Sequence, residues 1–248
     1  MYHGFLDKYA GLDSPVHRLD PRAKISSALA ALVIVTSEPR GDIIPYGLYY
    51  LILAVIILLS RVPLDYYLKR ILVVTPFVLA VVILLPVSFI LTGQDIALDI
   101  DTAVFQPLSI LLKAFWALLV LTVLTSTERM HTLLAALRLM KSPTVLNVIL
   151  ALTYRYIFIL TDETLRTGRA RESRLTGRPS GGHLALYGNQ AALVFIRSWE
   201  RSHLVYQAML ARGFEGNFPV YRKFSFTLKD CLVMIGFILI LLLIRGLV

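Results

Sequence analysis

The sequence predicts an all-α integral membrane protein with about five transmembrane helices and two long helices on the cytoplasmic side. Hydrophobic residues make up 57% of the 248 residues, and the mean hydropathy is +0.71. This apolar share is too large for a soluble core, so much of it has to face lipid. A helix needs about 20 apolar residues to cross about 30 Å of hydrocarbon, and five runs approach that length.

The N-terminal segment is too charged to be a cleaved secretory signal, because such a signal needs an apolar stretch. We expect the first span itself to direct insertion. The charged residues of the first 24 positions are Asp7, Lys8, Asp13, Arg18, Asp20, Arg22 and Lys24. The single cysteine, Cys231, excludes an intramolecular disulfide and a cysteine-based metal site.

The first apolar run covers residues 25–37 and looks short for a span. Asp20-Pro21 is typical of a helix start, with an N-cap followed by proline at the first helical position. The helix is therefore expected to begin at Pro21, with Arg22 and Lys24 extending toward the lipid headgroups.

Four further apolar runs follow, and three of them contain a proline or a lysine that bears on the helix. Pro45 lies in the first turn of its run, Pro76 predicts a kink, and Lys113 is a charge within a span. Because Lys113 lies near the start of its run, extension to the interface is the preferred reading over a functional intramembrane charge. The runs cover residues 43–60, 68–89, 107–125 and 228–247.

The loops between the runs predict the orientation. Residues 61–70 contain Arg61, Lys69 and Arg70, whereas residues 92–106 contain three aspartates and no lysine or arginine. By the positive-inside rule the N-terminus and the first loop are cytoplasmic, and the second loop is external. Residues 126–223 hold 14 of the 25 basic residues against 6 acidic ones, so this stretch is expected in the cytoplasm.

One apolar run inside the basic stretch leaves an alternative open. Residues 145–160 are nearly long enough to span, but they include Asn147, Tyr154 and Arg155. A crossing would also place the many basic residues that follow outside the cell. An in-plane or bundle-packed helix is preferred, and a sixth span is the alternative.

The basic stretch predicts two long helices. Residues 144–174 contain no proline and lie between Pro143 and Pro179, and residues 184–212 form the second helix, stopped by Gly213 in the C′ position. The first helix ends near Ala170-Arg171-Glu172 and the second ends at Ala211-Arg212-Gly213. Arginine can donate two parallel hydrogen bonds to one carboxylate. An arginine at the end of each helix therefore predicts a partner with two acidic pockets. The plainer reading, positive-inside markers that contact lipid, applies to most such arginines.

No enzyme site is recognisable. The sequence lacks a phosphate-binding loop, an H-E-x-x-H motif, a C-x-x-C motif and a G-x-S-x-G elbow. His3, Asp7, Asp13 and His17 could be imagined as a metal site, but their irregular spacing favours ordinary solvated side chains.

Three segments resemble the transmembrane T component of energy-coupling-factor (ECF) transporters, and most closely the cobalt or nickel branch, the CbiQ-like proteins. They are residues 12–24, with the Asp-Pro-Arg-x-Lys entry to the first span, Ala170-Arg171-Glu172, and residues 209–214. The similarity covers nearly the whole chain. The first arginine motif departs from the commoner Ala-Arg-Gly by ending in Glu172.

The resemblance implies a non-catalytic scaffold of a prokaryotic cell membrane. Two coupling helices, ending at Arg171 and Arg212, would insert into two cytosolic ABC ATPase subunits and lever a separate substrate-binding membrane subunit, for cobalt or nickel uptake. No resident cofactor, metal or nucleic-acid partner is expected. The expected organisation is residues 1–125 with four spans, residues 126–226 with the coupling helices, and residues 227–248 with the last span.

A self-sufficient channel or secondary transporter is the competing class. It would require polar or acidic residues around a site at the membrane midplane. The predicted spans contain almost none beyond Lys113. The scaffold is therefore preferred.

The predicted topology can be tested by single-cysteine labelling in a Cys231→Ser background. Leu175→Cys should resist an impermeant thiol reagent in intact cells and react after permeabilisation, because residues 126–226 are expected in the cytoplasm. Labelling of this position in intact cells would favour six spans.

Overall fold

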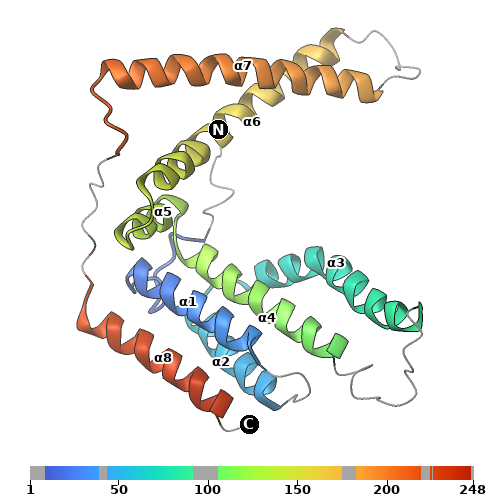
Figure 1. Ribbon diagram of the computed structural model, residues 1–248, viewed down its shortest axis with the longest axis vertical. Helices are drawn as coiled ribbons and strands as arrows, with labels where there is room; N and C mark the ends of the chain where they lie inside the picture. Colours follow the sequence, from blue (N-terminus) through green and yellow to red (C-terminus); the bar gives the residue numbers. More distant parts are fainter. Residues whose placement is uncertain are drawn as a thin grey trace. The chain divides into compact units, whose positions relative to one another are not determined.

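The described part of the chain is helical throughout (Figure 1). The computed structural model describes residues 9–38, 44–91, 106–174, 183–218, 224 and 226–246. The predicted external loop, apart from its last residue, and the predicted linker at residues 179–182 lie outside these ranges. Eight helices occur within them: α1 (Pro21–Thr36), α2 (Ile44–Ser60), α3 (Leu64–Leu91), α4 (Gln106–Thr127), α5 (Met130–Leu139), α6 (Thr144–Arg174), α7 (His183–Ala211) and α8 (Leu228–Gly246).

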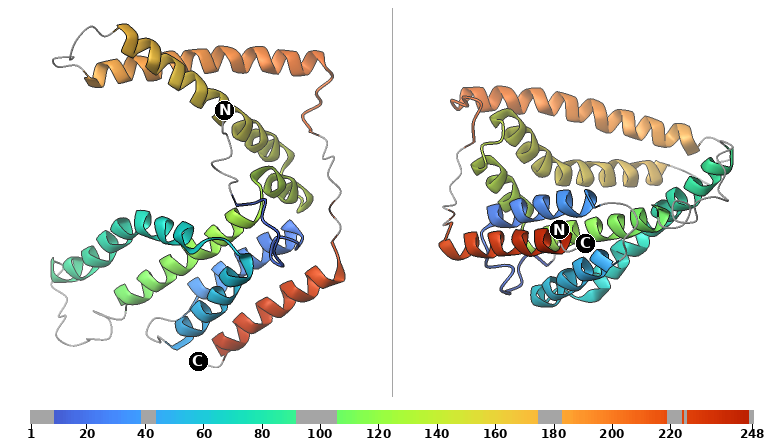
Figure 2. Two further views of the ribbon diagram at one scale, coloured as in Figure 1. Left: turned by 180° about the vertical axis from the view of Figure 1, so that it is seen from behind. Right: turned by 60° about the horizontal axis from the view of Figure 1, so that its bottom comes forward.

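The chain divides into two compact units. The membrane unit contains α1 to α4, α8 and α5 up to Ala136, and the helix pair contains α6, α7 and the end of α5 from Leu137. In the membrane unit, α4 contacts α1, α2 and α3, and α8 contacts α1 and α2. Figure 2 shows α4 lying between α1 and α3.

The predicted start of α1 is confirmed. Asp20 has an extended backbone, and its carboxylate accepts a hydrogen bond of 2.9 Å from the backbone N–H of Arg22. Pro21 follows at the first helical position, where its missing N–H costs nothing. Aspartate followed by proline is therefore sufficient to begin this helix.

The core of the membrane unit combines aromatic rings with satisfied polar groups. Tyr49 and Trp116 pack edge to face with ring centroids 6.3 Å apart, and both are almost fully buried. The Trp116 Nε1–H donates to the Tyr49 carbonyl at 3.3 Å, and the Tyr49 hydroxyl donates to the buried Glu38 carboxylate. Buried polar groups without such partners would be costly in lipid.

Helix α3 is longer than predicted and passes through both of its prolines. It begins at Leu64, directly after Pro63, rather than at residue 68. Pro76 has no N–H for the carbonyl of Leu72, which predicts a bend. Figure 2 shows that the ribbon of α3 changes direction along its length. Near this point Thr75 Oγ1 donates to the Ile71 carbonyl at 2.7 Å.

Helix lengths bear on the number of spans. Three helices of the described ranges are long and apolar enough to cross a bilayer: α3 over Leu64–Leu84, α4 over Pro107–Thr127 and α6 over Thr144–Ser173. Helices α1 and α2, with 16 and 17 residues, are shorter. The five-span topology thus stays a prediction. Because α6 is long and apolar enough to span, the alternative of a sixth span also stays.

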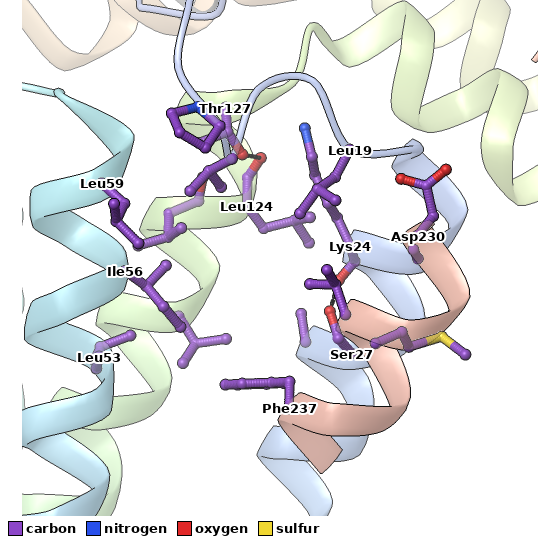
Figure 3. Close-up of a pocket in the computed structure, with 18 residues that line it drawn as sticks. Leu19, Lys24, Ser27, Leu53, Ile56, Leu59, Leu124, Thr127, Asp230 and Phe237 are labelled. Atoms are coloured by element: carbon purple, nitrogen blue, oxygen red, sulfur yellow. Dashed lines mark hydrogen bonds between the residues drawn. The ribbon is translucent and has the colours of Figure 1, made fainter. Parts of the chain in front are cut away.

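An apolar cavity of about 320 Å³ lies within the membrane unit (Figure 3). Apolar side chains of α1, α2, α4, α8 and the segment before α1 form most of its wall. Lys24 and Asp230 are the only charged residues among its 18 lining residues. Both make polar contacts with neighbouring groups. The cavity therefore lacks the converging polar groups of an ion-transport site.

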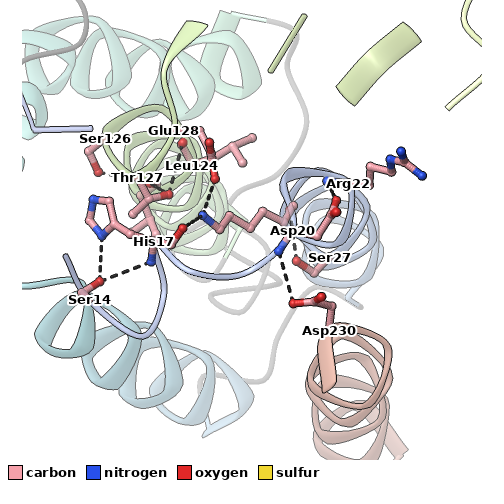
Figure 4. Close-up of polar contacts among 12 residues, drawn as sticks. Ser14, His17, Asp20, Arg22, Ser27, Leu124, Ser126, Thr127, Glu128 and Asp230 are labelled. Carbon is pink, nitrogen blue, oxygen red and sulfur yellow. Dashed lines mark hydrogen bonds and ion pairs between the residues drawn. The ribbon is translucent and has the colours of Figure 1, made fainter. Parts of the chain in front are cut away.

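Polar contacts tie the start of α1 to α8 and to the end of α4 (Figure 4). The Asp230 carboxylate caps α8 through the N–H and hydroxyl of Thr227, and it also accepts from the Asp20 N–H at 3.2 Å. Lys24 Nζ forms an ion pair of 2.5 Å with Glu128, and both side chains are at least 90% buried. The prediction that Lys24 extends toward the lipid headgroups is therefore wrong, because a carboxylate within the protein pairs with it. The same ammonium donates to the His17 carbonyl at 3.1 Å.

The opposite end of α1 is capped by cations from the same two helices. Lys113 Nζ donates to the carbonyls of Thr36 and Glu38 at 3.1 and 2.9 Å, and Arg245 Nη2 reaches the Ser37 carbonyl at 3.5 Å. Cations at a helix C-terminus also interact favourably with its dipole. Lys113 is therefore a capping residue, a role that neither of its sequence-based readings included. Taken together, the contacts make α1 and α8 parallel and α4 antiparallel to both.

The buried Lys24–Glu128 pair gives a stability prediction. Lys24→Met should leave the Glu128 carboxylate buried and unpaired, at a cost of about 3–5 kcal/mol. The double variant Lys24→Met with Glu128→Met should recover most of this loss. Thermal unfolding of the detergent-solubilised chain measures both.

Arg18→Met is the matched control. Arg18 forms a pair of 2.7 Å with Asp13, but both side chains are more than 70% exposed, so its loss should have little effect. Equal melting temperatures for Lys24→Met and Arg18→Met would contradict the proposed importance of the buried pair.

Candidate functional site

The first long helix, α6, has the predicted bounds because local features fix its start. The chain turns after α5 with Lys141 at a φ of 64°. The Ser142 N–H bonds to the Leu137 carbonyl and the Lys141 N–H to the Arg138 carbonyl, the pattern of a Schellman motif. Pro143 then precedes Thr144, the first residue of α6. Asn147 is satisfied locally, since its amide donates to the Ser142 carbonyl at 3.2 Å.

The second long helix, α7, ends as predicted at a glycine C-cap. Gly213 has a φ of 78°, a conformation that favours glycine. The Phe214 N–H bonds to the Met209 carbonyl and the Gly213 N–H to the Leu210 carbonyl, both at 3.0 Å. The helix covers His183–Ala211, so Arg212 lies directly after its last residue.

The two helices cross and run antiparallel (Figure 1). Glu163 of α6 pairs with Arg197 of α7 at 2.5 Å. Toward the end of α6, Arg171 contacts Gln190 near the start of α7. Toward the start of α6, Leu152 lines the same groove as Met209 near the end of α7. The two arginine motifs therefore lie at opposite ends of the helix pair.

The separation of the two ends follows from helix geometry. Arg171 contacts Gln190, and Arg212 follows Gln190 by 22 positions along α7 and its end. At about 1.5 Å per residue this corresponds to about 33 Å. Such a distance is too long for a single pocket to receive both arginines.

Arg171 is held against α7. Its Nη1 donates to Gln190 Oε1 at 2.9 Å, and its guanidinium lies 4.3 Å from the centroid of the Tyr187 ring. Its Nη2 lies 4.0 Å from Glu172 Oε1, a long ion pair. The side chain is 20% exposed. Arginine on an aromatic face gains cation–π and stacking interactions, so its position depends on both helices.

A basic cleft of about 650 Å³ surrounds Arg171 between α6 and α7. Three arginines line it, Arg166, Arg171 and Arg197, together with Glu163 and uncharged residues. Since Glu163 pairs with Arg197, the remaining positive charge favours an acidic group from a partner.

Arg212 has different surroundings. Its side chain is exposed and makes no hydrogen bond or ion pair with the residues that the structure describes. Ala211 and Gly213 beside it are exposed too, as are Ala170 and Glu172 at the other end. The sequence suggested two similar docking residues. In the structure Arg171 is held against α7, whereas the Arg212 side chain makes no hydrogen bond or ion pair with the described residues.

Tyr187 and Gln190 were missed by the sequence reasoning. Their importance depends on which residues of α7 face Arg171, and this register is set by the crossing of two helices. Their spacing of three residues places both on one helix face, but the sequence alone does not identify the facing residue on α6.

The N-terminal candidate metal residues have other partners where the structure describes them. Both oxygens of Asp13 accept from Arg18, which holds the pKa of Asp13 below its ordinary value. His17 Nδ1 lies 2.7 Å from Ser14 Oγ and His17 Nε2 lies 3.2 Å from the Tyr9 carbonyl, and burial lowers the pKa of His17. Within the described ranges no three His, Cys, Asp or Glu side chains form a metal-binding group. His3 and Asp7 lie outside these ranges.

Comparisons with known proteins agree with the resemblance. The family model CbiQ, described as cobalt transport protein, matches residues 13–221. The energy-coupling factor transporter transmembrane protein EcfT of Bacillus selenitireducens is 30% identical over 94% of this chain and 93% of its own length. EcfT of Bacillus subtilis is 26% identical over 95% of this chain and 94% of its own. The uncharacterized protein MJ1571 of Methanocaldococcus jannaschii is 27% identical over 95% and 84%. The chain therefore belongs to the CbiQ family and is homologous, over most of its length, to the transmembrane proteins of energy-coupling factor transporters.

Proposed function

We propose that this multi-pass membrane protein is the transmembrane coupling subunit of an ECF-type ABC importer. It links ATP hydrolysis by two cytosolic ATPase subunits to movement of a separate substrate-binding membrane subunit. The names of its EcfT relatives support the transporter class. The placement of Arg171 and Arg212 at opposite ends of one helix pair is the observation that carries the mechanism.

The helix pair suits the transmission of force between two partners. Each docking arginine, Arg171 or Arg212, contacts one ATPase subunit at its end of the pair. The Glu163–Arg197 ion pair connects the two helices between these ends, and the contacts of Gln190 connect them at the Arg171 end. Closure of the ATPase subunits on ATP would bring the two ends closer, and the helices would transmit this displacement to the membrane unit.

The contacts of α1 and α8 support the five-span topology with both long helices in the cytoplasm. Helix α8 is parallel to α1 and antiparallel to α4. At the start of both α1 and α8, Asp230 accepts from the Asp20 N–H, and at the end of both, Arg245 donates to the Ser37 carbonyl. The segment between α4 and α8 then leaves and re-enters the membrane unit on the same side. The chain must therefore cross the membrane an even number of times, or not at all, between α4 and α8. A single additional span formed by α6 does not meet this requirement.

Cobalt or nickel is the proposed substrate. The description of the matching family supports cobalt. We place substrate recognition in the partner membrane subunit, since the cavity of this chain is lined almost entirely by apolar side chains and metal ions of this kind need imidazole, thiolate or carboxylate ligands.

Reversal of the docking charges tests the proposal. Arg171→Glu and Arg212→Glu should each weaken ATPase binding, because a carboxylate would face an acidic pocket instead of pairing with it. The double variant should lose both copurification of the ATPases and metal uptake. Arg201→Glu, an exposed arginine of α7 away from both ends, is the control. Normal assembly and uptake by the double variant would exclude the docking role.

The isolated chain should have neither of the transporter's two activities. We expect the purified protein to hydrolyse no ATP, because its sequence lacks a phosphate loop. We expect it to bind cobalt or nickel with no site tighter than about 1 μM, because the described part of the chain holds no preformed set of metal ligands. Isothermal titration calorimetry measures metal binding. A stoichiometric submicromolar site that disappears in His3→Ala and His17→Ala would show that this chain handles the substrate itself.

A further inference from the structure

We infer that Gln190 and Tyr187 of α7 are positioning residues for Arg171, so that the first docking point is built by both helices. This inference rests on the proposed docking function. Neither residue belongs to an arginine motif, and neither is expected to contact the ATPase subunit in order to act. Their effect is on the orientation of the Arg171 guanidinium before the partner arrives.

The side-chain amide of Gln190 has a defined orientation. Its Nε2 donates to the Thr164 carbonyl at 3.0 Å and lies 3.3 Å from Thr167 Oγ1. These contacts direct the amide nitrogen toward the body of α6, so Oε1 faces Arg171 and accepts from its Nη1 at 2.9 Å. A flipped amide would place a donor against the guanidinium, which has only donors.

Gln190 packs against α6 beside Gly168. A Cβ added to Gly168 would lie 3.4 Å from Gln190 Nε2, which is an ordinary van der Waals contact. Alanine therefore fits at this position, and the orientation of Gln190 depends on its hydrogen bonds rather than on the glycine.

Tyr187 supplies the second restraint. Its ring centroid lies 4.3 Å from the Arg171 guanidinium carbon, close enough for the guanidinium to pack on the ring face. One hydrogen bond and one packed face together restrict a side chain that otherwise has many rotamers. Less conformational freedom is then lost when a partner binds, which is the usual origin of affinity gained by preorganisation.

The guanidinium retains unused hydrogen-bonding capacity. Its Nε is buried and makes no hydrogen bond with the described residues, and Nη2 is 4.0 Å from Glu172 Oε1, beyond hydrogen-bonding distance. A carboxylate of an ATPase subunit would supply an acceptor for Nη2, whereas the buried Nε is out of its reach. Arg212 has no comparable support from the described residues, so the two docking points should differ in how strongly they depend on neighbouring residues.

A double-mutant cycle tests the inference. The dissociation constant is measured between the full-length chain in detergent and the ATPase subunits that copurify with it. Arg212 is left unchanged in the background chain, so that the complex still forms when Arg171 is replaced. In this background Gln190→Leu should weaken binding about tenfold. When Arg171 is also replaced by alanine, Gln190→Leu should cause no further loss.

The tyrosine provides a matched pair of variants. Tyr187→Phe keeps the ring and should bind like the background chain, whereas Tyr187→Leu removes it and should weaken binding severalfold. Thr167→Val is a further control, because it removes one contact of Gln190 and leaves the bond to Arg171. Circular dichroism and size-exclusion chromatography show whether each variant keeps the fold.

The outcomes separate the inference from the proposed function. If Arg171→Ala itself leaves the affinity unchanged, the docking function of Arg171 is wrong. If Arg171→Ala weakens binding but Gln190→Leu and Tyr187→Leu do not, only the positioning role is wrong. If Gln190→Leu weakens binding equally with and without Arg171, the glutamine merely holds the helices together, and this result too overturns the positioning role.

Discussion

Hydrogen bonding at the two ends of α1 constrains the arrangement of the membrane unit. A helix end in a bilayer has unsatisfied N–H or carbonyl groups, and there is no water in the hydrocarbon region to satisfy them. At one end Asp20 meets Asp230 of α8, and Lys24 pairs with Glu128 beside α4. At the other end Lys113 of α4 and Arg245 of α8 donate to the last carbonyls.

These contacts also fix the register of the three helices. Lys113 and Glu128 are 15 residues apart, as are Asp230 and Arg245, so α4 and α8 each span about 22 Å between their contacts with α1. A shift of one helix by a turn would break a contact at both ends. The rest of the unit, including the Tyr49–Trp116 core and the apolar cavity, packs on this frame.

The sequence was most informative where structure depends on adjacent residues. Asp20-Pro21 at the start of α1, the bounds of α6 after Pro143 and the cap at Gly213 depend on local hydrogen bonds and backbone conformation. Helix α5 was not anticipated, because its ten residues form a short amphipathic segment rather than a span.

Contacts between distant residues could not be predicted in this way. Lys113 caps a helix whose last residues lie about 75 positions away in the chain, and Arg171 packs on residues of a different helix. The arginine motifs were found from their sequence, but their unequal surroundings depend on how α6 and α7 cross. A pattern identifies which residues matter more readily than it identifies what they contact.

The central claim is that one chain holds two ATPase subunits, one at each end of the helix pair. The most direct measurement is cysteine-specific cross-linking from Glu172→Cys and Glu215→Cys in a Cys231→Ser background, followed by native mass spectrometry of the intact complex. Both positions are exposed and lie near Arg171 and Arg212, the proposed docking residues. The account predicts that each cysteine captures a different ATPase copy, giving one chain with two ATPase subunits. Capture of a single copy by both cysteines, in a complex of one chain with one ATPase subunit, would contradict it.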